Sequence, residues 1–287
     1  MTNGALVLAG GGSVGIAWEL GFLAGLENQN PSLMREIRDP GTTYVGTSAG
    51  SVVAAMLASG ADLAQLVKPE FMSAADRTSK GRGSIWGIAR IATSMVTARI
   101  GAKTPEDGRK RIGAFAVKAS TGPESVWIDS FGARLPDHSW PERRLLVTAV
   151  DIDSGEFRVF DRDSGVDLVH AVAASCAVPG IFPPVTINGR RYMDGGMRSI
   201  ANADLAAGCD PVLILVPMRE GGAGMGSVSK DELSVFTHSR HHLAYANADS
   251  VRAFGRNPLS TSTRAASAHA GFQQGQNSEQ AVGALWS

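Results

Sequence analysis

Short apolar runs, each followed by a glycine turn and then by helically spaced apolar positions, recur in the first sixty residues. Residues 5–9 form a continuous apolar run, which is typical of a strand buried on both faces of a parallel sheet. A glycine-rich turn follows, and then a helical pattern over 16–27. The strand-like segment 43–45 repeats the scheme and leads into a helix of small and apolar residues over 51–58. Two such units predict parallel strands joined by crossover helices.

The rest of the chain continues this alternation of strands and helices. Strand patterns occupy 144–150 and 156–160, which a polar turn joins as an antiparallel hairpin. A second hairpin is indicated by Asn188-Gly189-Arg190 between two short β-rich runs. Further segments predict helices over 170–176, 231–254 and 278–285, and a buried strand over 211–216.

The predicted fold class is α/β, a three-layer sandwich with a central, mostly parallel sheet flanked by helices. No internal repeat and no clear boundary divides the chain, so we expect one domain over residues 1–287. Within it we expect a basic helical insert at about 60–140 and a helical C-terminal tail from about residue 231.

The composition excludes several classes of protein. The formal net charge is zero and 44% of the residues are hydrophobic, which argues against non-specific nucleic-acid binding and in favour of a sizeable core. The two cysteines, Cys176 and Cys209, do not make a disulfide framework and favour a reducing compartment. The N-terminus lacks the features of a signal peptide, and no apolar stretch approaches the ~20 residues that span a bilayer. We therefore expect a soluble, cytoplasmic protein.

Charge is nevertheless concentrated in one segment. Between Arg77 and Lys118, ten Lys and Arg residues stand against two acidic ones, so that this segment carries +8 and the remainder −8. Residues 84–99 within it have the apolar spacing of an amphipathic helix. Two interpretations are open: a core-facing helix with solvated basic residues, or a helix that covers a site or makes peripheral contact with an anionic membrane.

The strongest candidate for chemistry is Gly46-Thr47-Ser48-Ala49-Gly50. It matches G-x-S-x-G in the required context of strand, sharp turn and helix. In such a turn Ser48 is held in a strained conformation as a nucleophile, and Gly46 and Gly50 leave room for the surrounding backbone. The alternative is an ordinary serine at a helix N-cap, which needs one glycine at most.

The glycine-rich turn Gly10-Gly11-Gly12-Ser13-Val14-Gly15 has two interpretations. It matches the dinucleotide fingerprint G-x-G-x-x-G, but that fold needs a second strand ending in an acidic residue about 20 positions later. The sequence at 32–39 has helical spacing instead. The alternative is that free backbone N–H groups at this helix N-terminus hold an oxyanion rather than a phosphate.

A candidate acid follows the second predicted hairpin. Asp194 ends a strand and is followed by Gly195 and Gly196, so that backbone can pass close to its carboxylate. The alternative is a turn acid that caps its own loop. The sequence pattern Asp151-x-Asp153-x-Gly155 resembles part of a calcium-binding loop, but Arg162 occupies the position at which that loop requires Glu. We therefore predict no metal site and no cofactor.

In this order the glycine-rich turn, the Ser48 turn and Asp194-Gly195-Gly196 resemble the motifs of the patatin-like phospholipase family. The segment 173–184, ahead of the acid, is also similar to a block of that family, and the resemblance covers residues 4 to about 217. It implies catalytic Ser48 and Asp194, with an oxyanion hole at Gly10, Gly11 and Gly12. Supporting glycines would be Gly15, Gly46, Gly50, Gly195 and Gly196.

The resemblance implies a serine acyl hydrolase that cleaves lipid acyl esters through a Ser–Asp dyad. Asp194 would take the proton of Ser48 directly, although a free Asp has a pKa near ~3.9, poorly matched to a base at neutral pH. Apolar packing from Phe182, Met193 and Met197 would raise that pKa. The chain departs from the family at Val14, where the family usually has Arg.

Three alternatives stay open at this stage. A conventional triad would add one of His238, His241 and His242 after Asp194. The Val14 departure leaves open a catalytically silent lipid-binding protein, although we expect activity to persist, and the glycine-rich turn allows a nucleotide-binding oxidoreductase. The sequence does not determine the oligomeric state, the head group or the acyl-chain length of the substrate.

Overall fold

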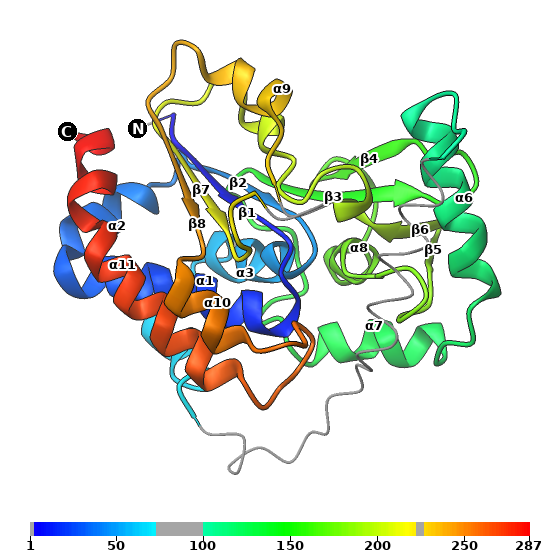
Figure 1. The fold of residues 1–287 in the computed structure, drawn as a ribbon, viewed down its shortest axis with the longest axis horizontal. Coiled ribbons are helices and arrows are strands. Elements are labelled where there is room, and N and C mark those ends of the chain that lie inside the picture. Colours follow the sequence, from blue (N-terminus) through cyan, green and yellow to red (C-terminus); the bar gives the residue numbers. More distant parts are fainter. Residues whose placement is uncertain (1–2, 73–99, 222–226) are drawn as a thin grey trace.

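The computed structural model describes residues 3–72, 100–221 and 227–287. The predicted helix at 84–99 therefore lies outside the described residues, as does most of the loop after Gly221. In the described part, a twisted mixed sheet runs through the molecule and helices cover it (Figure 1).

The sheet has eight strands, in the order β5-β6-β3-β2-β1-β7-β8, with β4 on the other edge of β3. Five strands run parallel along the path from β3 to β8, and β4 and β6 are antiparallel to β3. This is the α/β, mostly parallel arrangement that the sequence predicts. The strands are β1 (Ala5–Leu8), β2 (Thr43–Gly46), β3 (Leu145–Asp151), β4 (Phe157–Phe160), β5 (Val185–Ile187), β6 (Arg190–Asp194), β7 (Val212–Val216) and β8 (His241–Tyr245).

Helices lie on both faces of the sheet. Alternate side chains of β1 divide between them, because Leu6 and Leu8 join the core under the long helices while Ala5 and Val7 join the core on the opposite face. The first face carries α1 (Gly12–Gln29), α2 (Pro31–Ile37), α3 (Ala49–Ala58), α4 (Leu63–Val67), α7 (Glu124–Gly132), α8 (Leu168–Ser175), α10 (Ala248–Phe254) and α11 (Arg264–Trp286). The second face is covered by the short elements η3 (Ala203–Ala206), α9 (Lys230–Leu233) and η4 (Ser234–Phe236), while α6 (Pro105–Lys118) packs near β6.

The register places the ends of β2 and β6 next to each other. Gly46, at the end of β2, is paired with Val147 of β3. Asp194, at the end of β6, is paired with Ala149, and β4 occupies the other edge of β3 along the same stretch. The two strands therefore lie on one edge of β3 and approach each other from opposite directions, which brings their C-terminal residues together.

The helix predicted over 231–254 is wrong in its middle part. Residues His241–Tyr245 form β8, which pairs in parallel with β7 along its whole length. Pairing with an open sheet edge outweighs the local helical pattern here, because it satisfies a row of backbone groups that would otherwise face solvent. The final helix is also longer than the predicted 278–285, because α11 begins at Arg264.

Helix α11 packs against α1 through glycines on both helices. A Cβ atom at Gly21 or Gly25 would stand 2.2 or 2.1 Å from a carbonyl oxygen of α11, and one at Gly271 or Gly275 would stand 2.3 or 2.0 Å from a carbonyl oxygen of α1. The absence of side chains thus allows the two backbones to touch. The C-terminal helix is in this way fixed to the helix that follows the glycine-rich turn.

Candidate active site

Ser48 lies in a sharp turn between β2 and α3, at φ 52° and ψ −121°. A residue with a side chain adopts such a positive φ at a cost of about 1–3 kcal/mol, and does so where the surroundings enforce it. The neighbouring glycines are required by close contacts: a Cβ at Gly46 would stand 2.4 Å from Ser51 Cα, and one at Gly50 2.0 Å from the Leu8 oxygen. The strand, turn and helix expected around Ser48 are all present.

The glycine-rich turn lies beside Ser48, and its N–H groups are not equivalent. The N–H of Gly10 donates to the Ile200 carbonyl at 2.8 Å, so the expectation that Gly10 offers a free donor is wrong. No described residue accepts a hydrogen bond from the N–H of Gly11, Gly12 or Ser13. Gly10 instead provides space, because a Cβ there would stand 3.3 Å from Ser48 Cβ.

Gly15 belongs to the first turn of α1 and faces the Ser48 turn. A Cβ on Gly15 would stand 3.1 Å from Pro217 Cγ and 3.5 Å from Ala49 Cβ. Val14, the departure from the family pattern, is 1% exposed and therefore occupies a core position where a charged side chain would have to find a partner.

Asp194 ends β6 and is 3% exposed. Burial raises the pKa of its carboxyl to about 7, while the Ser48 side chain and the Gly196 N–H act in the opposite direction. The Gly196 N–H reaches Oδ1 at 2.7 Å, so Asp194 does cap its own loop. It nevertheless also faces Ser48. The apolar neighbours expected to raise this pKa include Met193, which is fully buried, and Met197, which is 5% exposed.

The glycines after Asp194 allow a close approach of two backbone segments. A Cβ at Gly195 would stand 2.2 Å from Thr148 Oγ1, and one at Gly196 would stand 2.9 Å from Asp194 Oδ1. A side chain at either position would displace the carboxylate or the strand beside it. Both glycines are therefore needed for the acid to occupy this place.

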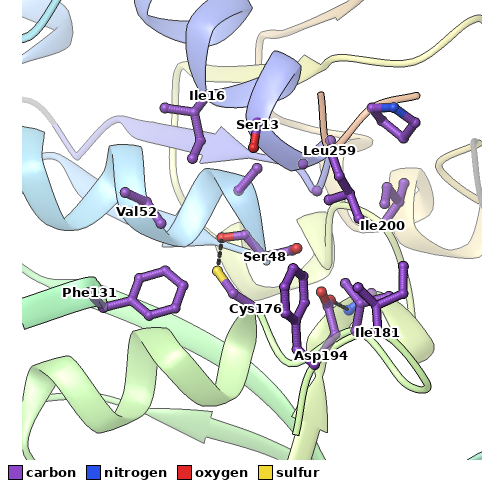
Figure 2. Close-up of a pocket in the computed structure, with 18 of the residues that line it drawn as sticks. Ser13, Ile16, Ser48, Val52, Phe131, Cys176, Ile181, Asp194, Ile200 and Leu259 are labelled. Atoms are coloured by element: carbon purple, nitrogen blue, oxygen red, sulfur yellow. Dashed lines mark hydrogen bonds between the residues drawn. The ribbon is translucent and has the colours of Figure 1, made fainter. Parts of the chain in front are cut away.

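Ser48 and Asp194 open into one cavity of about 390 Å³, which the glycine-rich turn also borders (Figure 2). Its walls are largely apolar, with one acid, Asp194, and one base, Arg134, among the described lining residues. An aromatic wall closes one side, where Trp127 of α7 stacks on Phe182 with ring centroids 3.8 Å apart and meets Phe131 edge-on at 4.8 Å. The other apolar lining residues include Ile16, Val52, Val178, Ile181, Ile200, Met218, Pro258 and Leu259.

The histidines of a conventional triad lie elsewhere. No histidine is among the described residues that line the cavity. His241 and His242 belong to β8, and the register aligns His241 with the first residue of β7, at the opposite end of the parallel strands from Ser48. His238 is exposed in the segment before β8. The geometry therefore associates Ser48 with a carboxylate and not with an imidazole.

The acidic turn after β3 is a local structure. Asp151 Oδ1 accepts hydrogen bonds from the N–H groups of Asp153 and Ser154, both at 2.9 Å, and Arg190 pairs with its other oxygen at 3.2 Å. Within the described ranges, no three acidic, His or Cys side chains are grouped so that they could hold a metal ion. The segment that a dinucleotide fold would use for its second strand is the helix α2.

Several residues that contact the site are not predicted by the sequence analysis. Thr47 Oγ1, Thr148 Oγ1 and Asn202 Nδ2 form a buried network with contacts of 2.9 and 3.0 Å from Thr47 to its two partners. Ser175 and Cys176, at the end of α8, contact the Ser48 backbone. A buried serine in an otherwise apolar helix is the one signal in the sequence that could have indicated this, because such a hydroxyl needs a partner.

Comparison with known proteins gives a family match over most of the chain. A family model described as patatin-like phospholipase matches residues 6–207. A search of curated proteins found no match. Among the described residues, none of the helices combines the length and the hydropathy that crossing a membrane requires.

Two solved structures are similar to the chain at low identity. VipD from Legionella pneumophila is 14% identical, with a TM-score of 0.47, over 99% of this chain and 67% of that one. The type III effector protein ExoU is 20% identical, with a TM-score of 0.37, over 96% of this chain and 53% of that one. The chain thus spans about half the length of the ExoU chain.

Proposed function

Since the chain belongs to the patatin-like phospholipase family, we propose that it is a serine acyl hydrolase that cleaves acyl esters of lipids. The observation that carries this proposal is the arrangement of Ser48 and Asp194. A serine at a strained strand-to-helix turn and a buried carboxyl with a pKa of about 7 face the same apolar cavity. A base with a pKa near the working pH is what general-base chemistry requires.

In the proposed reaction Asp194 accepts the proton of Ser48 as Oγ attacks the ester carbonyl carbon. The negative charge that develops on the carbonyl oxygen lies next to the unengaged N–H groups of Gly11 and Gly12. Collapse of the tetrahedral intermediate breaks the ester bond, and Asp194 returns the proton to the leaving alcohol. Asp194 then takes a proton from a water molecule that attacks the acyl-enzyme carbonyl. As the bond between the acyl group and Ser48 Oγ breaks, Asp194 returns this proton to Oγ, and the fatty acid is released.

Valine in place of arginine at position 14 should affect the rate of the reaction but leave this mechanism unchanged. Loss of one oxyanion donor costs about 2.7–4 kcal/mol of transition-state stabilisation, but Val14 changes a side chain and leaves the N–H groups of Gly11 and Gly12 in place. We therefore propose that activity is retained. The substrate would be an acyl ester whose chain occupies the apolar cavity, and no cofactor takes part.

The test is hydrolysis of a short p-nitrophenyl ester and of a diacylphospholipid by three proteins in parallel: wild type, Ser48→Ala and Asp194→Asn. We expect both variants to lose at least ~10³-fold in kcat, as is usual for residues that act as one catalytic unit. A fluorophosphonate probe should label Ser48 in the wild type and not in Ser48→Ala. A folded wild type that neither turns over the esters nor reacts with the probe would favour the silent lipid-binding alternative.

A further inference from the structure

Three consecutive residues at the end of α8 contact both members of the dyad. Ser175 Oγ accepts a hydrogen bond from the Ser48 N–H at 2.9 Å. The Cys176 thiol donates to the Ser48 carbonyl oxygen at 3.1 Å, the bond drawn in Figure 2. The Ala177 carbonyl oxygen accepts from the Asp194 N–H at 3.0 Å. We call residues 175–177 the bracket.

The bracket holds both backbone groups of Ser48. Its N–H is engaged by Ser175, which is fully buried. Its carbonyl oxygen receives three donors: the Cys176 thiol, the Ser51 hydroxyl at 2.6 Å and the Ser51 N–H at 2.9 Å. Burial raises the pKa of the Cys176 thiol well above its usual range, so the thiol keeps the proton that it donates. A backbone at positive φ persists where its surroundings over-determine it, and these side chains do so for Ser48.

The same segment spans the gap between the ends of two strands. Gly46 of β2 pairs with Val147 of β3, and Asp194 of β6 pairs with Ala149 on the same edge of β3. The strands β2 and β6 are not paired with each other. Backbone pairing with β3 places each strand, and the Asn202 amide, which contacts Thr47 and the Gly195 carbonyl, links the residues that follow them. The bracket joins the two ends directly, because it bonds to Ser48 from one residue and to Asp194 two residues later.

We propose that Ser175 and Cys176 are positioning residues that set the separation and orientation of Ser48 and Asp194. This inference rests on the proposed function. The two side chains touch no reacting atom in the proposed scheme and act through the backbone of Ser48. Misplacement of reacting groups by about 1 Å can cost ~10²-fold in rate, so the effect should appear in kcat while KM for a small ester stays within about twofold.

Ser175→Ala is the first test variant, because it leaves the buried Ser48 N–H without an acceptor. We expect kcat to fall ~10- to 100-fold and the rate of fluorophosphonate labelling of Ser48 to fall in parallel. The matched control is Ser267→Ala in α11. Ser267 is also fully buried, but its hydroxyl donates to the carbonyl oxygen of Thr263 and not to a group near the site. The control should lose stability without any loss of kcat.

The pH profile separates positioning from general loss of structure. The Ser48 side chain lowers the pKa of Asp194, so a displaced Ser48 should move the acidic limb of the kcat/KM profile to a higher pH than in wild type. Ser175→Thr, which keeps a hydroxyl, should return kcat toward wild type. A folded Ser175→Ala enzyme with wild-type kcat and an unmoved limb would overturn the inference while leaving the proposed function intact.

A second set of variants covers the case in which Ser175→Ala does not fold. Cys176→Ala and Ser51→Ala each leave one side-chain donor on the Ser48 carbonyl besides the Ser51 N–H, so each should lower kcat by no more than about threefold. The double variant leaves only the Ser51 N–H there and should lower kcat by tenfold or more. Strictly additive effects would overturn the inference. An inactive wild type that does not label would instead overturn the proposed function and, with it, this assignment.

Discussion

The N–H of Val14 donates a hydrogen bond of 3.1 Å to the carbonyl oxygen of Pro258. Val14 stands where the family usually has Arg, and Pro258 lies in the loop between α10 and α11, beyond the residues that the family model matches. The same loop covers the glycine-rich turn, since a Cβ on Gly12 would stand 2.7 Å from the Pro258 oxygen and 3.0 Å from Leu259 Cδ2. The C-terminal segment therefore anchors the turn through its backbone.

This anchoring predicts that the contact between α1 and α11 is needed for a stable site. In Gly275→Ala the new methyl group would stand 2.0 Å from the Phe22 oxygen, and overpacking of this kind typically costs about 1–3 kcal/mol. We expect the free energy of unfolding, measured by urea denaturation, to fall by this amount. Ester hydrolysis should become more sensitive to temperature, because the loop over Gly12 is attached to α11.

The control for that prediction lies on the same helix. Gly283 has no atom within 3.4 Å of the position of a Cβ, and Ala is favoured over Gly in a helix by up to about 1 kcal/mol. Gly283→Ala should therefore leave stability unchanged or raise it. If the two variants lowered stability equally, the close contact at Gly275 would not be the cause.

The parts of this structure that follow from sequence are those set by local patterns. The apolar run of β1, the glycines around Ser48 and the turn at Asn188-Gly189 each have their cause within a few residues. Ser48 and Asp194 could be predicted for the same reason, because each lies in a short and distinctive sequence motif.

The remaining parts depend on contacts between distant segments. Strand β8 forms because β7 has an open edge, although its own residues include two adjacent histidines. The Gly10 N–H is engaged because Ile200 arrives from a distant loop. No local pattern around Ser175 shows that its hydroxyl meets the Ser48 N–H, because that contact depends on the packing of α8 against the Ser48 turn.

The pKa of Asp194 predicts the pH dependence of hydrolysis. A general base must be ionised, and burial raises the pKa of this carboxyl to about 7. For a neutral ester, kcat/KM should therefore be flat above about pH 8 and fall tenfold per pH unit well below pH 7. Stopped assays between pH 5 and 9 measure this, and an acidic limb near pH 4 would contradict the assignment of Asp194 as a buried base.

Variants at the histidines of the alternative triad should preserve that profile. His238, His241 and His242 do not line the described cavity, so replacement of each by Ala should leave kcat/KM within about twofold and the limb in place. Loss of the limb, or a loss of activity of 10³-fold, in any one of these variants would indicate that an imidazole serves as the base.

The Arg134 side chain in the cavity predicts a preference for substrates with an anionic group. Arg134 is the only basic side chain among the lining residues that the structure describes, and it is half-buried. Its contribution to binding a phosphodiester should be on the order of 1 kcal/mol, which is about fivefold. Arg134→Gln should therefore lower kcat/KM for a diacylphospholipid about fivefold more than for a neutral p-nitrophenyl ester. In Arg35→Gln, on the exposed side of α2, both values should stay unchanged.

Asp194 should also reduce the stability of the folded protein at the pH at which it works. Its pKa is about 7 in the folded chain, against 3.8 for an exposed Asp side chain, so the folded state binds more protons than the unfolded state between these values. The free energy of unfolding from this group therefore decreases as pH rises from about 4 to 7. The full difference would be on the order of 4 kcal/mol, as an upper limit.

Asp194→Asn removes this titration and keeps the shape of the side chain. The variant should be more stable than wild type at pH 8 and lose that advantage at pH 4.5, where the wild-type carboxyl is already protonated in the folded state. Urea denaturation at the two pH values measures the difference, with Asp129→Asn at an exposed position of α7 as the control. An Asp194→Asn variant that is inactive, and whose advantage in stability grows as pH rises from about 4 to 7, would show that the buried carboxylate is maintained for its chemistry. A change in stability that is equal at both pH values would instead mean that its ionisation is not opposed by the fold.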